Sequence, residues 1–152
     1  IIIIYTCSFS TIIWVNLTNT DYNDKLNILF ILIICISTDI GGYIFGKIIG
    51  GKKFTKISPN KTYAGIIGSF IIPLIFGYLY NAIYSEILVL KINIFLLIIF
   101  ISFISQCGDL MISFFKRKAK IKDTGSILPG HGGILDRIDG MLLALPIGLI
   151  FI

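Results

Sequence analysis

The sequence predicts an all-α, polytopic integral membrane protein with about five transmembrane helices, which form one membrane-embedded domain over residues 1–152. Two observations carry this prediction. Hydrophobic residues make up 56% of the chain and charged residues only 14%, which is more apolar than a soluble domain of this length usually is. Long apolar segments also alternate with short polar ones, and most approach the roughly 20 residues that a helix needs to cross a bilayer. A soluble bundle of buried helices is the weaker alternative.

Short polar stretches separate the apolar segments and define the spans in order. Pro73 predicts a kink in the third span, because a proline inside a helix removes a backbone hydrogen bond. The chain begins without Met inside an apolar run, so we interpret it as the C-terminal part of a longer protein. The five predicted spans are residues 1–17, which supply most of the first, Asn27–Gly50, Tyr63–Tyr84, Ile92–Phe115 and Ile134–Ile152.

Basic residues are concentrated in two short windows. Of the 13 Lys and Arg residues, five lie within residues 47–61 and five within residues 116–122, whereas the loops at 18–26 and 85–91 are nearly balanced in charge. Cytoplasmic loops of membrane proteins carry such an excess of Lys and Arg. Both windows are therefore expected on the cytoplasmic side of a bacterial inner membrane. This topology explains the net charge of +5 without a nucleic-acid partner.

Four aspartates from three predicted spans fall at a similar depth near the cytoplasmic face. Asp39 lies in the second span, Asp109 near the end of the fourth, and Asp136 and Asp139 at the start of the fifth. Carboxylates at membrane depth face a cavity, a partner or an ion, so either a shared site or separate structural ion pairs would explain them. Asp136 and Asp139 are three residues apart and would share a helix face. Arg137 would project elsewhere, so a hard cation such as Mg²⁺ fits between them, although Asp136 could also serve the helix dipole.

Two loops next to these aspartates have the composition of phosphate-binding segments. Ser58 to Thr62 precedes the third span, so its backbone amides and Lys61 could hold a phosphate, while Thr62 would also cap the helix. The glycines around His131 let a backbone approach a ligand closely. His131 could act as a general base, but a structural role in the loop is the more common one for a single histidine.

The polar stretch from Ser113 to Asp139 resembles the signature of the phosphatidate cytidylyltransferase (CDP-diacylglycerol synthase) family. Segments upstream also look like the family: Asp39–Lys47, Ser58–Thr62 and Gly108-Asp109, so the resemblance covers residues 39 to about 146. Ile40, Asn60, Tyr63 and Ala64 depart from the residues usual there. The signature elements are Ser113, Lys116-Arg117, Lys122-Asp123, Gly125, Leu128-Pro129, His131-Gly132-Gly133 and Asp136-Arg137-x-Asp139.

The resemblance implies which residues form the site. Catalytic roles are expected for Asp109, Asp136, Asp139, Lys122 and Arg137. Substrate contacts are expected for Asp39, Ser58, Lys61, Thr62, Lys116, Arg117, Asp123, His131, Gly132 and Gly133. Mg²⁺ is expected on Asp109, Asp136 and Asp139, with Asp39 and Asp123 nearby, and the sequence leaves open whether a second metal ion joins it.

The resemblance also implies a reaction, in which CTP and phosphatidate give CDP-diacylglycerol and pyrophosphate. The lipid phosphate is itself the nucleophile, so the protein must chiefly neutralise charge and align the reactants. A CTP-dependent polyprenol kinase is the rival enzyme, and a transporter with aspartates along its path is the rival from another class. Polarity confined to the inner ends of the spans argues against a transporter. Whether two copies pair as a homodimer stays open.

Overall fold

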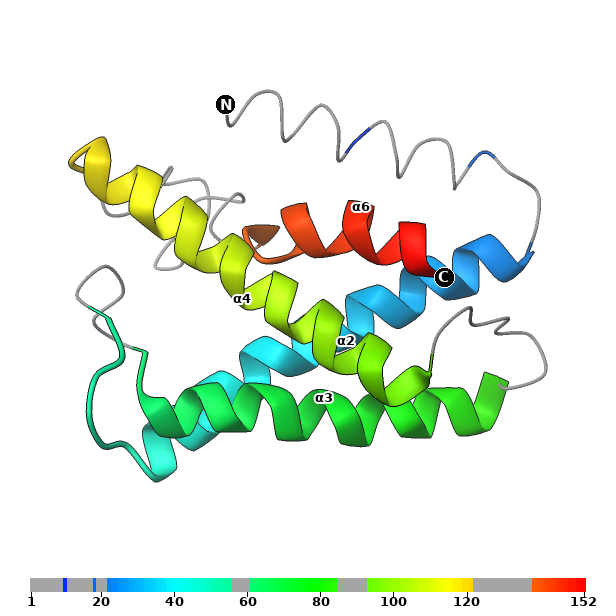
Figure 1. The fold of residues 1–152 in the computed structure, drawn as a ribbon, viewed down its shortest axis with the longest axis horizontal. Coiled ribbons are helices and arrows are strands. Elements are labelled where there is room, and N and C mark those ends of the chain that lie inside the picture. The colour runs from blue at the N-terminus through cyan, green and yellow to red at the C-terminus, as the bar shows by residue number, and fades with distance from the viewer. Residues whose placement is uncertain (1–9, 11–17, 19–21, 56–60, 85–92, 122–137) are drawn as a thin grey trace, which may run out of the picture.

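In the computed structural model, the described part of the chain comprises residues 10, 18, 22–55, 61–84, 93–121 and 138–152. The prediction of an all-α fold is confirmed there, because the only extended pairing among these residues is an isolated bridge between Lys53 and Thr62. Four helices run in the order α2 (Tyr22–Ile48), α3 (Tyr63–Tyr84), α4 (Ile94–Lys118) and α6 (Met141–Phe151) (Figure 1).

Three of these helices are long and apolar enough to cross a membrane. α2, α3 and α4 contain 27, 22 and 25 residues, or about 33–40 Å at 1.5 Å per residue, against a hydrocarbon core about 30 Å thick. α6 has 11 residues, or about 16 Å, which is too short by itself. The predicted first span lies outside the described residues except for Ser10. The count of five spans is therefore not confirmed.

The boundaries of the long helices follow the charges at their ends. α2 begins at Tyr22 rather than at Asn27, and Asp24 lies in its first turn. α4 continues to Lys118 rather than ending at Phe115, so that three basic residues occupy its last turn. Acidic residues are favourable at a helix N-terminus and basic residues at a C-terminus, so both predicted boundaries were too short. α3 has the predicted bounds and continues through Pro73.

Glycines bring α2 and α3 into backbone contact. A Cβ added to Gly65 would lie 2.8 Å from the carbonyl oxygen of Gly42, and one added to Gly41 would lie 3.0 Å from Cβ of Ile72. Gly68 faces Gly41 in the same interface. Small residues allow membrane helices to approach closely, and van der Waals contact rather than water exclusion then stabilises the pair. This contact fixes the position of Asp39 on α2 relative to the start of α3.

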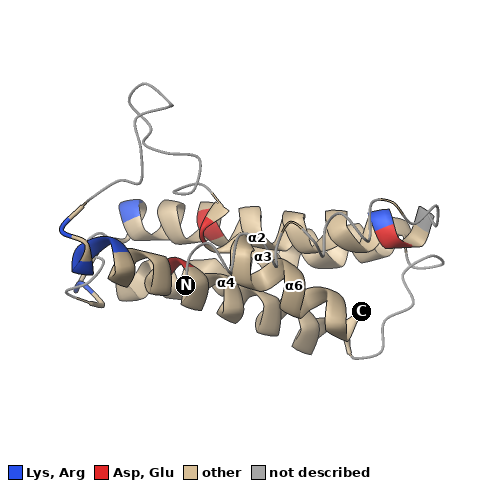
Figure 2. Ribbon diagram, turned by 90° about the horizontal axis from the view of Figure 1, so that it is seen from above, with Lys and Arg blue, Asp and Glu red and all other residues tan. Residues whose placement is uncertain are grey.

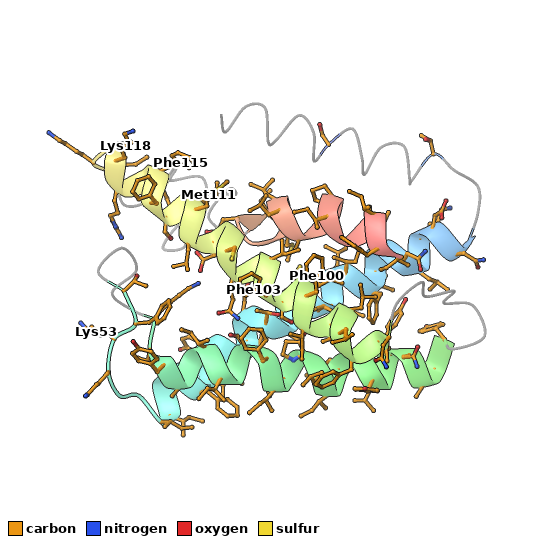
Figure 3. All side chains as sticks on the ribbon, in the orientation of Figure 1. Lys53, Phe100, Phe103, Met111, Phe115 and Lys118 are labelled. Carbon is orange, nitrogen blue, oxygen red and sulfur yellow. The ribbon has the colours of Figure 1, made fainter. Side chains whose placement is uncertain are left out.

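α4 packs against α2, α3 and α6 (Figure 1), and large apolar side chains such as Leu96 and Phe103 are exposed on it. Phe103 on α4 is 56% exposed and Ile83 on α3 is 72% exposed. Figure 3 shows such side chains projecting outward from the helices, as expected for surfaces that contact lipid. The core between the helices contains Phe30, Ile31 and Ile34 of α2, Leu97, Ile98 and Ile101 of α4, and Leu142 and Leu145 of α6.

Candidate active site

One end of the helix bundle gathers most of the described charge. The C-terminal ends of α2 and α4 and the loop after α2 carry the basic residues, among them Lys47, Lys53 and Lys118 (Figures 2 and 3). The N-terminus of α3 and the turn before α6 lie at this same end. Asp39, Asp109 and Asp139 are therefore brought together from three elements, at the basic end of the bundle.

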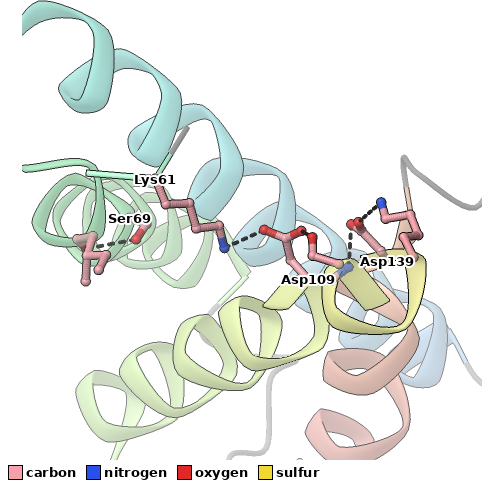
Figure 4. Close-up of polar contacts among 8 residues, drawn as sticks. Lys61, Ser69, Asp109 and Asp139 are labelled. Carbon is pink, nitrogen blue, oxygen red and sulfur yellow. Dashed lines mark hydrogen bonds and ion pairs between the residues drawn. The ribbon is translucent and has the colours of Figure 1, made fainter. Parts of the chain in front are cut away.

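Lys61 and Asp109 form an ion pair that joins the segment before α3 to α4 (Figure 4). Two backbone hydrogen bonds hold Lys61 in place, from Phe54 N to Lys61 O at 2.8 Å and from Tyr63 N to Lys52 O at 3.3 Å. The Ser113 hydroxyl donates to Asp109 Oδ1 at 3.4 Å. Both charged side chains keep about a quarter of their surface exposed, at 24% and 26%, so the pair can exchange with other ligands.

Thr62 caps α3, as its sequence position predicts. Its Oγ1 accepts a hydrogen bond from the backbone N–H of Gly65 at 3.1 Å, which satisfies one of the unpaired donors of the first helical turn. The Thr62 hydroxyl hydrogen remains on the side chain and can be donated to a ligand. The cap therefore does not exclude the predicted substrate contact.

Asp139 lies in the turn before α6 and pairs with Lys116 of α4. Lys116 Nζ is 3.7 Å from Asp139 Oδ2, and each side chain is only 12% exposed. Asp139 Oδ1 accepts a hydrogen bond from Gly140 N at 2.9 Å. Burial and the nearby Asp109 carboxylate together raise the pKa of Asp139 to about 7, although Lys116 opposes the shift. Two acidic groups thus face each other, and one of them readily holds a proton.

Glycines set the distance between these two carboxylates. A Cβ on Gly108 of α4 would lie 3.0 Å from Asp139 O and 3.1 Å from Gly140 O. A Cβ on Gly140 would lie 2.7 Å from the Ser105 hydroxyl. The turn before α6 therefore rests directly on the backbone of α4, immediately beside Asp109. Figure 4 shows Asp109 between Lys61 and Asp139.

A cavity of about 250 Å³ opens beside Asp109, between α2, α3 and α4. Asp39, Lys61 and Asp109 line it, which supports the predicted convergence of Asp39 with the other carboxylates. Its remaining polar lining residues are Thr38, Tyr43, Thr62, Ser69 and Gln106. Sequence reasoning gave no role to Thr38, Ser69 or Gln106. Gln106 precedes Asp109 by three residues and so shares its helix face, which is the signal that could have found it.

The structure corrects one element of the sequence argument. Spacing along the chain indicated only Arg137 as a cation next to Asp136 and Asp139, whereas Lys61 pairs with Asp109 and Lys116 pairs with Asp139. The alternative of ion pairing is thus realised for Asp109 and Asp139. Arg117 is not brought to these carboxylates, because its Nη1 reaches the carbonyl of Ile121 at 3.5 Å on the exposed side of α4.

Several predicted residues cannot be compared with the structure. Within residues 22–55, 61–84, 93–121 and 138–152, no three His, Cys, Asp or Glu side chains come together as a metal site. The third predicted metal ligand, Asp136, lies outside the described residues. So do Ser58, Lys122, Asp123, His131, Gly132, Gly133 and Arg137.

Comparison with known proteins agrees with the sequence resemblance. The chain is 37% identical to the phosphatidate cytidylyltransferase of Bacillus subtilis over 134 residues, which cover 88% of this chain and 49% of that protein. The Staphylococcus epidermidis and Staphylococcus haemolyticus enzymes of the same name are 44% and 42% identical over 128 residues, which cover 79% of this chain and 46% of each. The chain thus spans about half the length of these relatives. A family model described as "Cytidylyltransferase family" matches residues 1–152. The chain therefore belongs to this family.

Proposed function

We propose that the protein transfers a cytidylyl group from CTP to phosphatidate, which gives CDP-diacylglycerol and pyrophosphate. The observation that carries the proposal is the meeting of Lys61, Asp109, Lys116 and Asp139 at one end of an apolar helix bundle. This chemistry needs charges of both signs at a membrane surface, where a lipid and a water-soluble nucleotide can meet. The names of the relatives agree with it.

The reaction is a substitution at phosphorus. A non-bridging oxygen of the phosphatidate phosphate attacks the α-phosphorus of CTP. The bond from that phosphorus to the oxygen bridging to the β-phosphorus breaks, and pyrophosphate leaves with the electron pair. The attacking phosphate is already ionised near neutral pH, so no strong base is needed. The barrier arises largely from bringing two anions together in line.

Lys61 and Lys116 are suited to lower that barrier. Each ammonium group currently pairs with a carboxylate, and each can instead donate to phosphate oxygens when substrates bind. Lys122 and Arg137 are proposed to join them at the reacting phosphates. Asp39, Ser58, Thr62, Arg117, Asp123, His131, Gly132 and Gly133 are proposed to contact the substrates.

The carboxylates left behind would then hold Mg²⁺. The residues present fit this ion, because Asp109 and Asp139 are adjacent carboxylates. Burial and their mutual repulsion raise the pKa of Asp139, and a cation relieves that repulsion. Asp136 is proposed as a third ligand. When bound, Mg²⁺ would neutralise charge on the phosphates of CTP. The positions of basic residues favour a site on the cytoplasmic side of a bacterial inner membrane.

Labelled nucleotides test the proposal. The protein, expressed from its complete gene and reconstituted in vesicles that contain phosphatidate and a polyprenol, is supplied with CTP labelled in the cytosine ring or in the γ-phosphate. Cytosine label in the lipid fraction and γ-label in pyrophosphate are expected. A polyprenol that carries γ-label without cytosine would identify a kinase instead. Absence of both labels from the lipid fraction would refute both enzymatic hypotheses.

A further inference from the structure

A buried amide nitrogen of α4 lies next to the cavity without a hydrogen-bond partner. The Nε2 atom of Gln106 is buried and makes no hydrogen bond, and Gln106 lines the cavity. A buried donor without an acceptor costs about 1–3 kcal/mol, so the position favours a ligand that supplies an acceptor. Two neighbouring hydroxyls already have acceptors, because Thr38 donates to Ile34 O at 2.8 Å and Ser69 donates to Ile66 O at 2.8 Å.

The depth of Gln106 indicates which substrate reaches it. On α4, Gln106 lies ten residues before Lys116, or about 15 Å further from the basic end, and about 4.5 Å deeper than Asp109. The lysines at the end of α4 suit the headgroup region, where their charges stay solvated. A phosphate held by Lys61 would lie at the depth of Asp109, with the glycerol backbone of its lipid deeper still. The deeper part of the cavity therefore receives the lipid rather than the nucleotide.

The residues that line the cavity also indicate whether the acceptor for Gln106 is a neutral group or a second phosphate. Asp39 and Asp109 line the cavity on either side, and two carboxylates repel another anion. A neutral carbonyl oxygen avoids that repulsion, and within a bilayer it has no water to donate to it. The cavity of about 250 Å³ is smaller than the roughly 300–1,000 Å³ of sites that enclose whole drug-sized ligands, so it suits a headgroup and the first atoms of its glycerol.

We infer that Gln106 Nε2 donates a hydrogen bond to a glycerol ester carbonyl of the lipid substrate and so selects ester-linked over ether-linked phosphatidate. The inference rests on the proposed function and adds a specificity residue to it. A dialkyl ether phosphatidate has the same charge and length but lacks both carbonyl oxygens. With that lipid, the Gln106 donor stays buried and unpaired.

Rates with the two lipids in the presence of CTP test the inference. The wild-type protein is expected to show a kcat/KM for diacyl phosphatidate about three- to ten-fold above that for the dialkyl ether lipid, which is the worth of one neutral hydrogen bond. In Gln106→Met, a side chain of similar length without a donor, this ratio should fall to about one, with the KM for CTP unchanged. Ser102→Ala is the matched control, since Ser102 Oγ is also buried and unpartnered on α4 but is not among the cavity lining residues. It should keep the wild-type ratio.

The outcomes separate this inference from the proposed function. Cytidylyl transfer to both lipids at equal kcat/KM in the wild-type protein overturns the role of Gln106, and this result does not depend on whether the variant folds. An unchanged ester preference in Gln106→Met overturns it as well, and so does a raised KM for CTP with the preference intact, which would assign Gln106 to the nucleotide. Absence of cytidylyl transfer to either lipid overturns the proposed function and the inference with it.

Discussion

Replacing Gly108 with alanine tests whether the backbone contact between α4 and the turn before α6 controls catalysis. The added Cβ would lie 3.0 Å from Asp139 O, 3.1 Å from Gly140 O and 3.3 Å from Gly140 Cα. Ordinary contacts of a Cβ begin near 3.4 Å, so the turn must move away from α4 by about 0.4 Å. All three neighbours are backbone atoms, and none can move aside by changing a rotamer. Asp139 would therefore move relative to Asp109.

The expected effect on the rate follows from that displacement. A misplacement of about 1 Å can cost roughly a hundred-fold in rate, so a shift of about 0.4 Å should lower turnover by about five- to ten-fold. Overpacking costs about 1–3 kcal/mol, whereas alanine gains about 1 kcal/mol over glycine inside a helix. The net loss of stability should therefore be about 0–2 kcal/mol. The expected signature is a lower turnover, and a higher Mg²⁺ requirement, in a protein that still folds.

Gly148→Ala supplies the matched control. A Cβ at Gly148 on α6 would lie 2.9 Å from Ile31 Cδ1, which is the movable end of a side chain in the core. Cytidylyl transfer and thermal unfolding are measured for both variants in the same vesicles, over a range of Mg²⁺ concentrations. Gly108→Ala should need more Mg²⁺, and Gly148→Ala should match the wild-type protein. Wild-type turnover at low Mg²⁺ in Gly108→Ala would refute the idea that this contact positions the carboxylates.

Three further predictions concern the charged groups. Asp139→Asn and Asp109→Asn should keep near-normal stability without Mg²⁺ but lose Mg²⁺-dependent turnover. If the more buried Lys116–Asp139 pair were purely structural, Asp139→Asn would instead lose about 3–5 kcal/mol of stability. Because the folded-state pKa of Asp139 is raised to about 7, the metal-free protein should become less stable as the pH rises from about 4 to 7, and thermal unfolding of Asp139→Asn should show less of this loss. Single cysteines at Lys53 and Ser85, in a cysteine-free background, should react with a membrane-impermeant reagent from opposite sides, and labelling from one side would contradict the predicted topology.

The long helices could be predicted because their signal is local. α3 has the predicted bounds. α2 and α4 extend beyond the predicted spans at the ends that carry charged residues, and each begins or ends two residues inside the predicted span at its other end. Hydrophobic length alone could not decide the span count, since α6 is apolar but has only 11 residues. The close approach of α2 and α3 depends on glycines that face each other across two helices, such as Gly42 and Gly65, and no local pattern in one helix specifies that pairing.

Of the site, the meeting of Asp39 and Asp109 could be predicted from the sequence, but the partners of the carboxylates could not. Depth from the basic end brought Asp39 and Asp109 together, and both line one cavity. The partners of the carboxylates were missed, because Lys61 precedes Asp109 by nearly fifty residues and reaches it only through the loop that pairs with Lys53. Spacing along one helix, which suggested a pair at Asp136 and Asp139, cannot reveal a contact between separate elements.

The two ion pairs matter more for ligand binding at the site than for the stability of the fold. Lys61 and Asp109 remain about a quarter exposed, and partly solvated pairs contribute only about 0–1 kcal/mol to stability. The Lys116–Asp139 contact is longer, at 3.7 Å, and does not keep the pKa of Asp139 at its usual value. The core of apolar side chains and the glycine contacts of α2 with α3 hold the helices together without these charges. The lysines and aspartates can therefore separate at small cost, the lysines to phosphate and the aspartates to a cation, while the helices keep their positions.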